Sequence, residues 1–168
     1  MPIALYLGVY QGLFRKGAEG RIREELLKQD LLEAVIGLGS NIFYGTQLAA
    51  CVMVFKQNKP ANTKGKVLFI DGSDQVRVCR AQNFLEPHHV NQLFDWYTNF
   101  EEVENYTKVA SLDDIAENDY NLNIPLYVEK IIEDTLPSVE EALADLKLAW
   151  NESLRAEEMF VKILKNYI

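Results

Sequence analysis

"LLEAVIGLGSNIFYGTQLAACVMVFK", residues 31–56, joins two apolar runs through a segment that contains two closely spaced glycines. The runs 31–38 and 48–56 are short and continuous, which is typical of strands inside a sheet. Glycines after a strand suggest a phosphate loop, but a dinucleotide fingerprint needs a third glycine and a helix whose N-terminus holds the pyrophosphate. Here the third glycine is missing and Ile42-Phe43-Tyr44 leads into another strand. The sequence therefore predicts a strand-connecting turn.

The residues around this stretch extend the pattern to an α/β arrangement. The further elements expected are a buried strand, an amphipathic helix and another strand, at residues 3–10, 19–30 and 66–73. The helix would place Ile22, Leu26 and Leu27 on one face and its charges on the opposite face. Strand, helix and three more strands in this order indicate a mixed α/β domain.

After residue 80 the sequence changes to helical and loop patterns. Residues 86–100 predict a helix with Pro87 in its first turn, and Ser111 followed by Asp114 has the spacing of a capping box. The apolar positions of the first helix are Val90, Leu93, Phe94 and Tyr97. The Asn-rich segment 118–128 predicts loop or extended chain. We therefore expect three regions, 1–80, 81–136 and 137–168.

The last region predicts one long amphipathic helix of about 30 residues, roughly 45 Å if unbroken. Its apolar stripe consists of Val139, Leu143, Leu146, Trp150, Leu154, Val161 and Leu164. Such a helix either packs on a partner or a second copy, or folds back on its own domain. The residues expected at a partner interface are Trp150, Leu154, Val161 and Leu164.

The formal net charge of −8 conceals an asymmetry between the two halves. Residues 1–80 carry eleven Lys and Arg against seven Asp and Glu, whereas residues 81–168 carry six against eighteen. Because a strongly acidic chain repels a polyanion, the whole chain is not expected to hold DNA unaided. The basic side chains of the first half suit either phosphate contacts or a solvated surface. They include Arg15, Lys16, Arg21, Arg23, Lys56, Lys59, Lys64 and Lys66.

Composition and motifs exclude several other classes. No stretch approaches the ~20 apolar residues of a membrane span, and no basic segment precedes an apolar run at the N-terminus. Cys51 and Cys79 form no CxxC pair, which favours a reducing, cytoplasmic setting. His88 and His89 are adjacent, are expected to point in different directions and lie at no ligand spacing from a cysteine, so no metal site is expected. We find no pattern of a catalytic nucleophile.

Several motifs in a fixed order make the chain similar to a known family. They are "GLFRKGAEGRIREELLKQD", the stretch quoted above, "GKVLFIDGS", "QNFL" and "ENDYNLNIPLYV". Over roughly residues 3–130 the chain closely resembles the modification (methyltransferase, M) subunit of type I restriction–modification systems. The resemblance implies a Rossmann-like DNA adenine-N6 methyltransferase that uses S-adenosylmethionine. It also implies a DNA-specificity subunit as partner and, for cleavage, a restriction subunit.

The resemblance also implies what this chain lacks. Family members carry a glycine-rich cofactor loop after their first strand and an Asn-Pro-Pro-aromatic motif after their fourth, and neither occurs here. That motif accepts hydrogen bonds from the target amino group and stacks on the flipped base. We therefore expect the C-terminal part of a methyltransferase sheet followed by an α-helical region, from a shortened or split gene. Alone, this chain is expected neither to bind the cofactor tightly nor to transfer methyl groups, and no catalytic residue is expected in it.

The resemblance points to "NIFYGT" as a wall of the pocket for the target base. Phe43 or Tyr44 is expected to pack against the extruded base, with Asn41 and Thr46 as turn-forming neighbours. The alternative is that Phe43 lies in the core and Tyr44 caps a strand turn. Contacts to the DNA backbone are expected from Arg15, Lys16, Arg21 and Arg23, with ion pairs to Glu19, Glu24 or Glu25 as the simpler alternative.

Two departures from the family pattern affect these expectations. Gly39 stands where the family usually has Pro, which is expected to loosen the loop backbone. Leu126 stands where the family has a basic residue, which removes a phosphate or partner contact. Two functions from different classes remain open. One is a part of the catalytic subunit, and the other is a non-catalytic assembly module whose tail binds the specificity subunit or self-associates.

Overall fold

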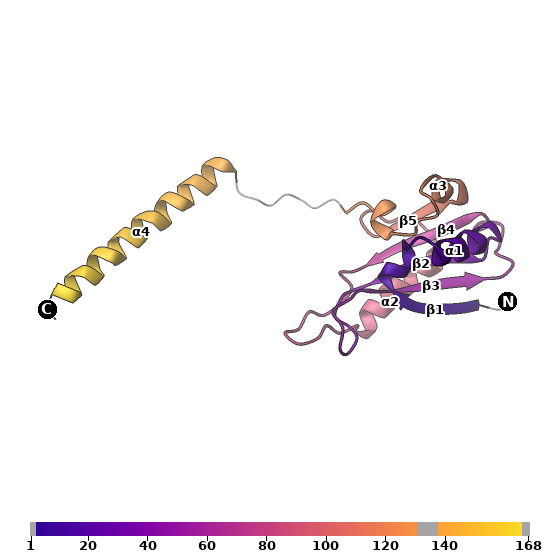
Figure 1. The fold of residues 1–168 in the computed structure, drawn as a ribbon, viewed down its shortest axis with the longest axis horizontal. Coiled ribbons are helices and arrows are strands. Elements are labelled where there is room, and N and C mark those ends of the chain that lie inside the picture. The colour runs from indigo at the N-terminus through magenta and orange to yellow at the C-terminus, as the bar shows by residue number, and fades with distance from the viewer. Residues whose placement is uncertain (1–2, 131–137, 166–168) are drawn as a thin grey trace. The chain divides into compact units, whose positions relative to one another are not determined.

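The computed structural model describes residues 3–130 and 138–165, and the chain divides into two compact units, 1–131 and 132–168. The first unit is a β-sheet with helices on both faces (Figure 1). The described part of the second unit is one helix, α4 (Val139–Lys165). The fold therefore has the α/β class that the sequence predicts, with a separate helical tail.

The sheet of the first unit has five strands. They are β1 (Ile3–Val9), β2 (Leu32–Leu38), β3 (Ala50–Lys56), β4 (Lys66–Gly72) and β5 (Thr107–Ser111). Their order in the sheet is β1-β3-β2-β4-β5. The two strands of the opening stretch, β2 and β3, are antiparallel neighbours, whereas β2 and β4 run parallel. The outer strands β1 and β5 are each antiparallel to their neighbour.

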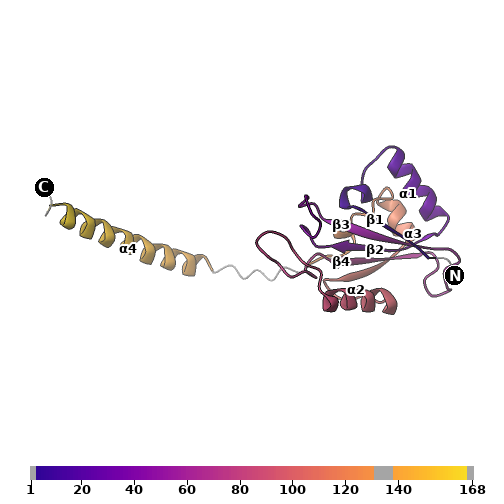
Figure 2. The same cartoon turned by 90° about the horizontal axis from the view of Figure 1, so that it is seen from below.

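Helices cover both faces of this sheet (Figure 2). On one face lie α1 (Ala18–Lys28), α3 (Leu112–Glu117) and the short 3-10 helices η1 (Tyr10–Leu13) and η2 (Ile124–Leu126). On the other face lies α2 (Pro87–Asn99). Each face of the sheet has its own hydrophobic core. β4 contributes side chains to both cores, because successive side chains of a strand point to opposite faces. Val67 and Phe69 pack on the first face and Leu68 and Ile70 on the second, all of them 0% exposed.

Local side-chain chemistry explains where two helices begin. Asp114 N donates to Ser111 Oγ at 3.1 Å and Ser111 N donates to Asp114 Oδ2 at 3.0 Å, so the predicted capping box is confirmed. α2 begins at the predicted Pro87, and Glu86 N donates to His89 Nδ1 at 3.1 Å in a second capping box. The His88 and His89 rings do not diverge as expected, since their centroids lie 3.9 Å apart.

A buried carboxylate links β2, β3 and α2. Glu33 is 2% exposed and lies where the β2–β3 register shifts between Leu32 and Ala34. It accepts a hydrogen bond from Lys56 Nζ at 2.8 Å and another from the Tyr97 hydroxyl at 2.7 Å. Burial, together with the hydrogen bond to Glu33, raises the pKa of Tyr97 above its ordinary value, so the hydroxyl keeps the proton that it donates.

The structure differs from the sequence-based expectations in three places. β1 was expected to be buried, but it is an outer strand on which Leu5 is 70% exposed. Strand β5 was not expected at all. On α2 the buried residues are Leu93 and Trp96, whereas Phe94 from the expected apolar face is 62% exposed. Residues 81–130 lie in the same compact unit as residues 3–80, with β5 in the sheet and α2 packed on β4.

The second unit matches the expected long helix in extent. α4 has 27 residues, and every side chain described within it is exposed. No helix of the described residues is long and apolar enough to cross a membrane.

Candidate functional site

Two loops follow the parallel strands β2 and β4 and meet at the carboxyl edge of the sheet. Loop 39–49 follows β2, and loop 73–86 follows β4. A Cβ added at Gly39 would lie 2.4 Å from Val76 Cγ1, and one added at Gly72 would lie 2.6 Å from the Gly37 carbonyl oxygen. These glycines therefore allow two backbones to approach closely. A residue with a Cβ at position 39 would require Val76 to shift. The expected loosening of the loop by Gly39 stays a prediction.

Side-chain amides hold the two loops together. Asn83 N donates to the Asn41 carbonyl at 2.8 Å, and Asn83 Nδ2 donates to the Ser40 carbonyl at 3.0 Å. In the other direction Asn41 Nδ2 donates to the Ala81 carbonyl at 3.3 Å. Asn41 itself has a φ of 57°, in the left-handed region that Asn tolerates better than most residues. Asn41, which was expected to form a turn, thus connects the two loops.

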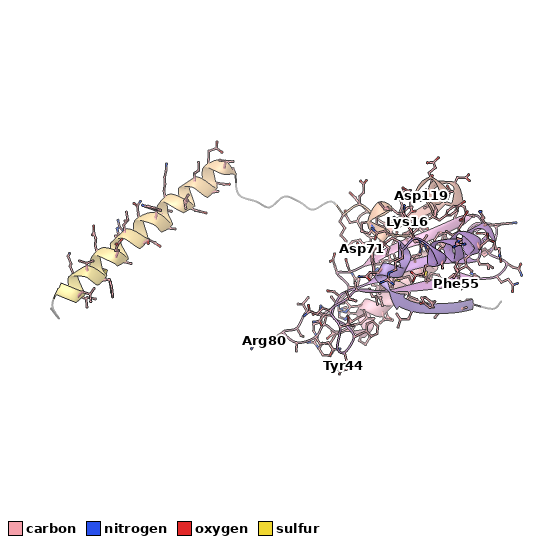
Figure 3. All side chains as sticks on the ribbon, in the orientation of Figure 1. Lys16, Tyr44, Phe55, Asp71, Arg80 and Asp119 are labelled. Atoms are coloured by element: carbon pink, nitrogen blue, oxygen red, sulfur yellow. The ribbon has the colours of Figure 1, made fainter. Side chains whose placement is uncertain are left out.

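The two aromatic residues of the first loop are exposed. Tyr44 is 91% exposed and Phe43 is 38% exposed, so neither belongs to the core. Thr46 Oγ1 accepts a hydrogen bond from Leu48 N at 3.1 Å, which turns the chain toward β3. Tyr44 lies at the outer end of its loop (Figure 3). The arrangement offers aromatic faces on a braced loop.

The second loop also carries residues that sequence reasoning missed. The Arg77 guanidinium lies 4.8 Å from the centre of the Phe84 ring and pairs with Glu86. Val78 is 77% exposed. Arg80 is exposed and has no hydrogen-bond or ion-pair partner among the described residues. In the sequence, the two arginines between β4 and the "QNFL" motif could have indicated these residues.

Buried and charged groups support the base of these loops. Burial, with a contribution from the Asp71 carboxylate, raises the pKa of Tyr10 to about 12, so its phenol stays neutral. Lys130 Nζ donates to Ser73 Oγ and to Asp74 Oδ2, both at 2.7 Å, and lies 3.4 Å from Asp71 Oδ2. Lys130 therefore ties the end of the first unit to the turn after β4.

The four basic residues expected to contact DNA have different surroundings. Arg15 pairs with Glu19 at 3.7 Å, as the simpler alternative predicted, and Lys16 and Arg21 are exposed. Arg23 is only 7% exposed. Its guanidinium donates to the carbonyls of Gly12 at 2.9 Å, Arg15 at 2.7 Å and Tyr120 at 3.3 Å. Arg23 thus joins three chain segments and cannot reach a phosphate without leaving them.

The other four basic residues divide in the same way. Lys59 is 8% exposed, and its ammonium donates to Asp30 Oδ1 at 2.6 Å and to the Lys66 carbonyl at 2.8 Å. Lys56 is bound to the buried Glu33. Lys64 and Lys66 are exposed. Two of these four lysines therefore stabilise the fold.

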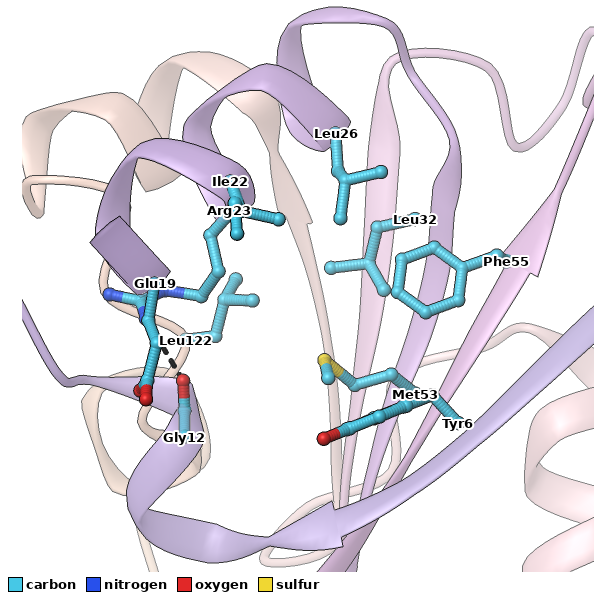
Figure 4. A pocket seen from close by; sticks show the side chains of 10 residues that line it. All are labelled: Tyr6, Gly12, Glu19, Ile22, Arg23, Leu26, Leu32, Met53, Phe55 and Leu122. Atoms are coloured by element: carbon cyan, nitrogen blue, oxygen red, sulfur yellow. Dashed lines mark hydrogen bonds between the residues drawn. The ribbon is translucent and has the colours of Figure 1, made fainter.

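An apolar groove lies away from the loops, between α1 and the sheet (Figure 4). It has a volume of about 460 Å³. Its residues come from β1, η1, α1, β2, β3 and the segment before η2 and are Tyr6, Gly12, Glu19, Ile22, Arg23, Leu26, Leu32, Met53, Phe55 and Leu122. Within residues 3–130 and 138–165, no three His, Cys, Asp or Glu side chains are grouped so that they could hold a metal ion.

A model of the N-6 DNA methylase family matches residues 8–135, which include strands β2 to β5 and the last two residues of β1. The chain belongs to the N-6 DNA methylase family. Its relatives include two type I restriction enzyme methylase subunits from Methanocaldococcus jannaschii. The MjaVII subunit is 37% identical over 138 residues, which cover 80% of this chain and 24% of that protein. The MjaVIII subunit is 33% identical over 159 residues, which cover 93% of this chain and 27% of that protein.

A solved structure of another family member has the same fold. It is the methyltransferase subunit of a type I restriction–modification system from Streptococcus thermophilus, with 35% identity and a TM-score of 0.72. The match covers 77% of this chain and 27% of that one. The predicted resemblance to type I methylase subunits and the methyltransferase-like α/β fold are thus confirmed. This N-6 DNA methylase chain spans about a quarter of the length of the curated relatives that it matches.

Proposed function

We propose that these residues form the C-terminal part of a type I methylase subunit, comprising the last strands of its catalytic sheet and the helical region that follows. The complete enzyme would transfer a methyl group from S-adenosylmethionine to adenine N6 in DNA, together with a DNA-specificity subunit. A restriction subunit would join the complex for cleavage. The cytoplasm, where DNA and the cofactor are both present, is the location that this activity requires. The observation that carries the proposal is the exposed aromatic pair on the braced loop after β2.

The loop geometry suits an extruded base. An enzyme that acts on a base must remove it from the stack and hold it against apolar or aromatic side chains. Stacking on an aromatic face is worth about 1–3 kcal/mol per base. Phe43 and Tyr44 offer such faces in a loop that Asn41 and Asn83 hold in place. Arg15, Lys16 and Arg21 would contact the DNA backbone, whereas Arg23 would position their loop.

The described residues do not fit the cofactor. Gly39 packs against Val76, and a Cβ on Gly37 would lie 2.8 Å from Ile124 Cδ1, so neither glycine leaves room for a ligand. The segment after them leads to β3 and not to a helix N-terminus, where an anion would bind. We therefore assign S-adenosylmethionine and the chemical step to parts of the methylase outside these 168 residues.

The pocket role is tested in a reconstituted full enzyme. Tyr44→Ala and Phe43→Ala are made singly, and at least one is expected to lower the rate of methyl transfer to DNA about 10-fold or more, because it removes the stacking face. Thermal unfolding should change little, since both rings are exposed. Phe94→Ala on α2 is the matched control, because that ring is 62% exposed and belongs to neither loop. Methylation unaffected by both loop variants would exclude the proposed pocket.

A second function is favoured by α4. Its stripe residues Trp150, Leu154, Val161 and Leu164 are 67%, 46%, 42% and 42% exposed. An isolated helix is marginal in water, and most helical stability comes from burying an apolar face. We infer that this stripe packs against helices of the DNA-specificity subunit, with self-association of the tail as the alternative.

Light scattering after size exclusion distinguishes these partners. The full chain and a chain ending at residue 131 are compared alone and with the DNA-specificity subunit of a type I system. Binding of that subunit only by the full chain supports the first partner. A dimer of the full chain that disappears on truncation supports self-association. Identical behaviour of the two chains in both experiments would exclude an assembly role for α4.

A further inference from the structure

The second loop, which follows β4, is closed into a small hairpin. Arg77 N donates to the Phe84 carbonyl at 2.8 Å, and Phe84 N donates to the Arg77 carbonyl at 3.0 Å. The Arg77 guanidinium also lies 4.8 Å from the centre of the Phe84 ring, so side chains close the same pair. Beyond it, Cys79 N donates to Asn83 Oδ1 at 3.2 Å. Residues 78–83 therefore form a defined turn, which we call the hairpin tip.

The hairpin tip is bound to the loop that carries the exposed aromatic pair. Gln82 Nε2 donates to the Ile42 carbonyl at 3.0 Å, and Ile42 directly precedes Phe43. This bond adds to the three hydrogen bonds that join the tip to Ser40 and Asn41. The tip and the aromatic pair are therefore held in one relative position.

Among the described residues, no group neutralises the positive charge of Arg80 in the hairpin tip. The first loop contains no charged residue at all. In the second loop, Asp74 lies 2.7 Å from Lys130 Nζ. The Arg77 charge is balanced by Glu86. Arg80 is exposed at the outer end of its loop (Figure 3), so its guanidinium is available to a partner.

We propose that Arg80 binds a backbone phosphate of the DNA beside the extruded adenine. The inference rests on the proposed function, in which Phe43 or Tyr44 holds that base. A base that leaves the stack turns about its own backbone, so the phosphates that flank it come to the rim of the pocket. A guanidinium presents a planar fork of N–H donors that fits two phosphate oxygens, and it stays charged at neutral pH.

The connection between the loops favours DNA over a protein partner. The competing occupant of Arg80 is an acidic side chain of another subunit. Such a subunit would sit beside the first loop, because the hydrogen bonds hold the hairpin tip against Ser40, Asn41 and Ile42. It would then obstruct the path by which a base reaches the aromatic faces. A phosphate of the same nucleotide arrives together with the base.

The salt dependence of DNA binding tests the proposal in the reconstituted full enzyme. The probe is a labelled duplex whose sequence the unsubstituted enzyme enriches from a random pool, so its choice does not depend on methylation. Each phosphate contact contributes about 0.9 to the slope of log affinity against log salt concentration. Arg80→Ala should therefore make this slope shallower by about 0.9 and weaken binding about 10-fold at low salt. Arg80→Lys keeps the charge and should keep the slope.

Lys64→Ala is the matched control. Lys64 is exposed like Arg80, but it precedes β4, whereas the hairpin tip follows that strand at its other end. Both alanine substitutions remove one positive charge from the surface. A general effect of net charge would therefore change both slopes equally, and loss of a local contact changes the slope of Arg80→Ala alone.

Each result decides the question. An unchanged slope in Arg80→Ala, or equal changes in Arg80→Ala and Lys64→Ala, would overturn the proposal. Loss of the DNA-specificity subunit from the Arg80→Ala enzyme would assign Arg80 to a protein partner and overturn it as well. Methyl transfer is read separately. An enzyme whose slope depends on Arg80 but that leaves adenine unmethylated contradicts the proposed function alone, and a methylating enzyme whose slope does not depend on Arg80 contradicts this inference alone.

Discussion

The two outer strands of the sheet, β5 and β1, differ in whether neighbouring chain covers their outer edges. β5 has five residues, and Val109 N donates to the carboxylate of Glu102 at 3.3 Å. Thr107 N donates to the Val103 carbonyl at 2.8 Å, so the chain that precedes β5 closes its outer side. β1 has seven residues and no charge, and no strand among the described residues pairs with its outer side. A closed edge is typical of a sheet boundary that stays in solvent, whereas an open apolar edge is able to pair with another strand.

The largest expected effect lies beside the closed edge. Phe69 of β4 is 0% exposed and stacks on Tyr127, with ring centres 3.9 Å apart. Phe69→Ala should lower the free energy of unfolding by about 3–5 kcal/mol, because it removes buried surface and leaves a cavity. Chemical denaturation followed by circular dichroism measures this, with the exposed Phe94→Ala as control. A loss below about 1 kcal/mol in the free energy of unfolding would mean that the β4–β5 side of the sheet is not its stable side.

An intermediate effect on stability is expected in the segment that precedes β5 and closes its outer edge. Thr107 is 4% exposed, and its hydroxyl accepts from Val103 N at 2.6 Å and donates to the Glu101 carbonyl. Thr107→Val keeps the shape but leaves these polar groups unpaired, which should cost about 1–3 kcal/mol. Hydrogen exchange of residues 103–109 should also become faster. Thr107→Ser retains the hydroxyl and lacks only the methyl group, so exchange should stay slow in it. Fast exchange in Thr107→Ser together with slow exchange in Thr107→Val would show that the methyl group, and not the hydroxyl, holds this segment in place.

The smallest effect is expected at the open edge. Leu5→Ala in the isolated chain should change the free energy of unfolding by no more than about 0.5 kcal/mol, because an exposed side chain has little packing to lose. Denaturation under the conditions used for Phe69→Ala gives the direct comparison. A loss of 2 kcal/mol or more would show that β1 is already covered in the isolated chain, and the contrast between the edges would then disappear.

Much of the sheet could be predicted from the sequence because its central strands are continuous apolar runs. β2, β3 and β4 were expected within two residues of their observed ends, and the helices α1 and α2 and the Ser111 capping box were also expected. The exposure of β1 could not be predicted, because an apolar run does not show on how many sides a strand has neighbours. β5 has only five residues, too few for a clear alternation, and its pairing with β4 is long-range.

The candidate site was less predictable than the fold. The loop with Phe43 and Tyr44 was recognised from its motif, and the exposure of both rings agrees with the role proposed for them. Arg23 was grouped with its basic neighbours, because sequence does not reveal that three carbonyls surround its guanidinium. The bracing by Asn83 was missed because it joins segments about forty residues apart, which meet only because β2 and β4 are parallel neighbours.

The buried Glu33 has a consequence for how the β2–β3 pair finds its alignment during folding. Shifting a strand by one residue would turn every side chain to the opposite face. In a shifted pairing Glu33 would lose Lys56 and Tyr97 together, although it is 2% exposed in the observed one. An ion pair broken in the interior costs about 3–5 kcal/mol. The Glu33 carboxylate thus destabilises shifted pairings of β2 and β3 that their hydrophobic residues alone would allow. In this way one polar residue selects the register of the stretch that defines the fold.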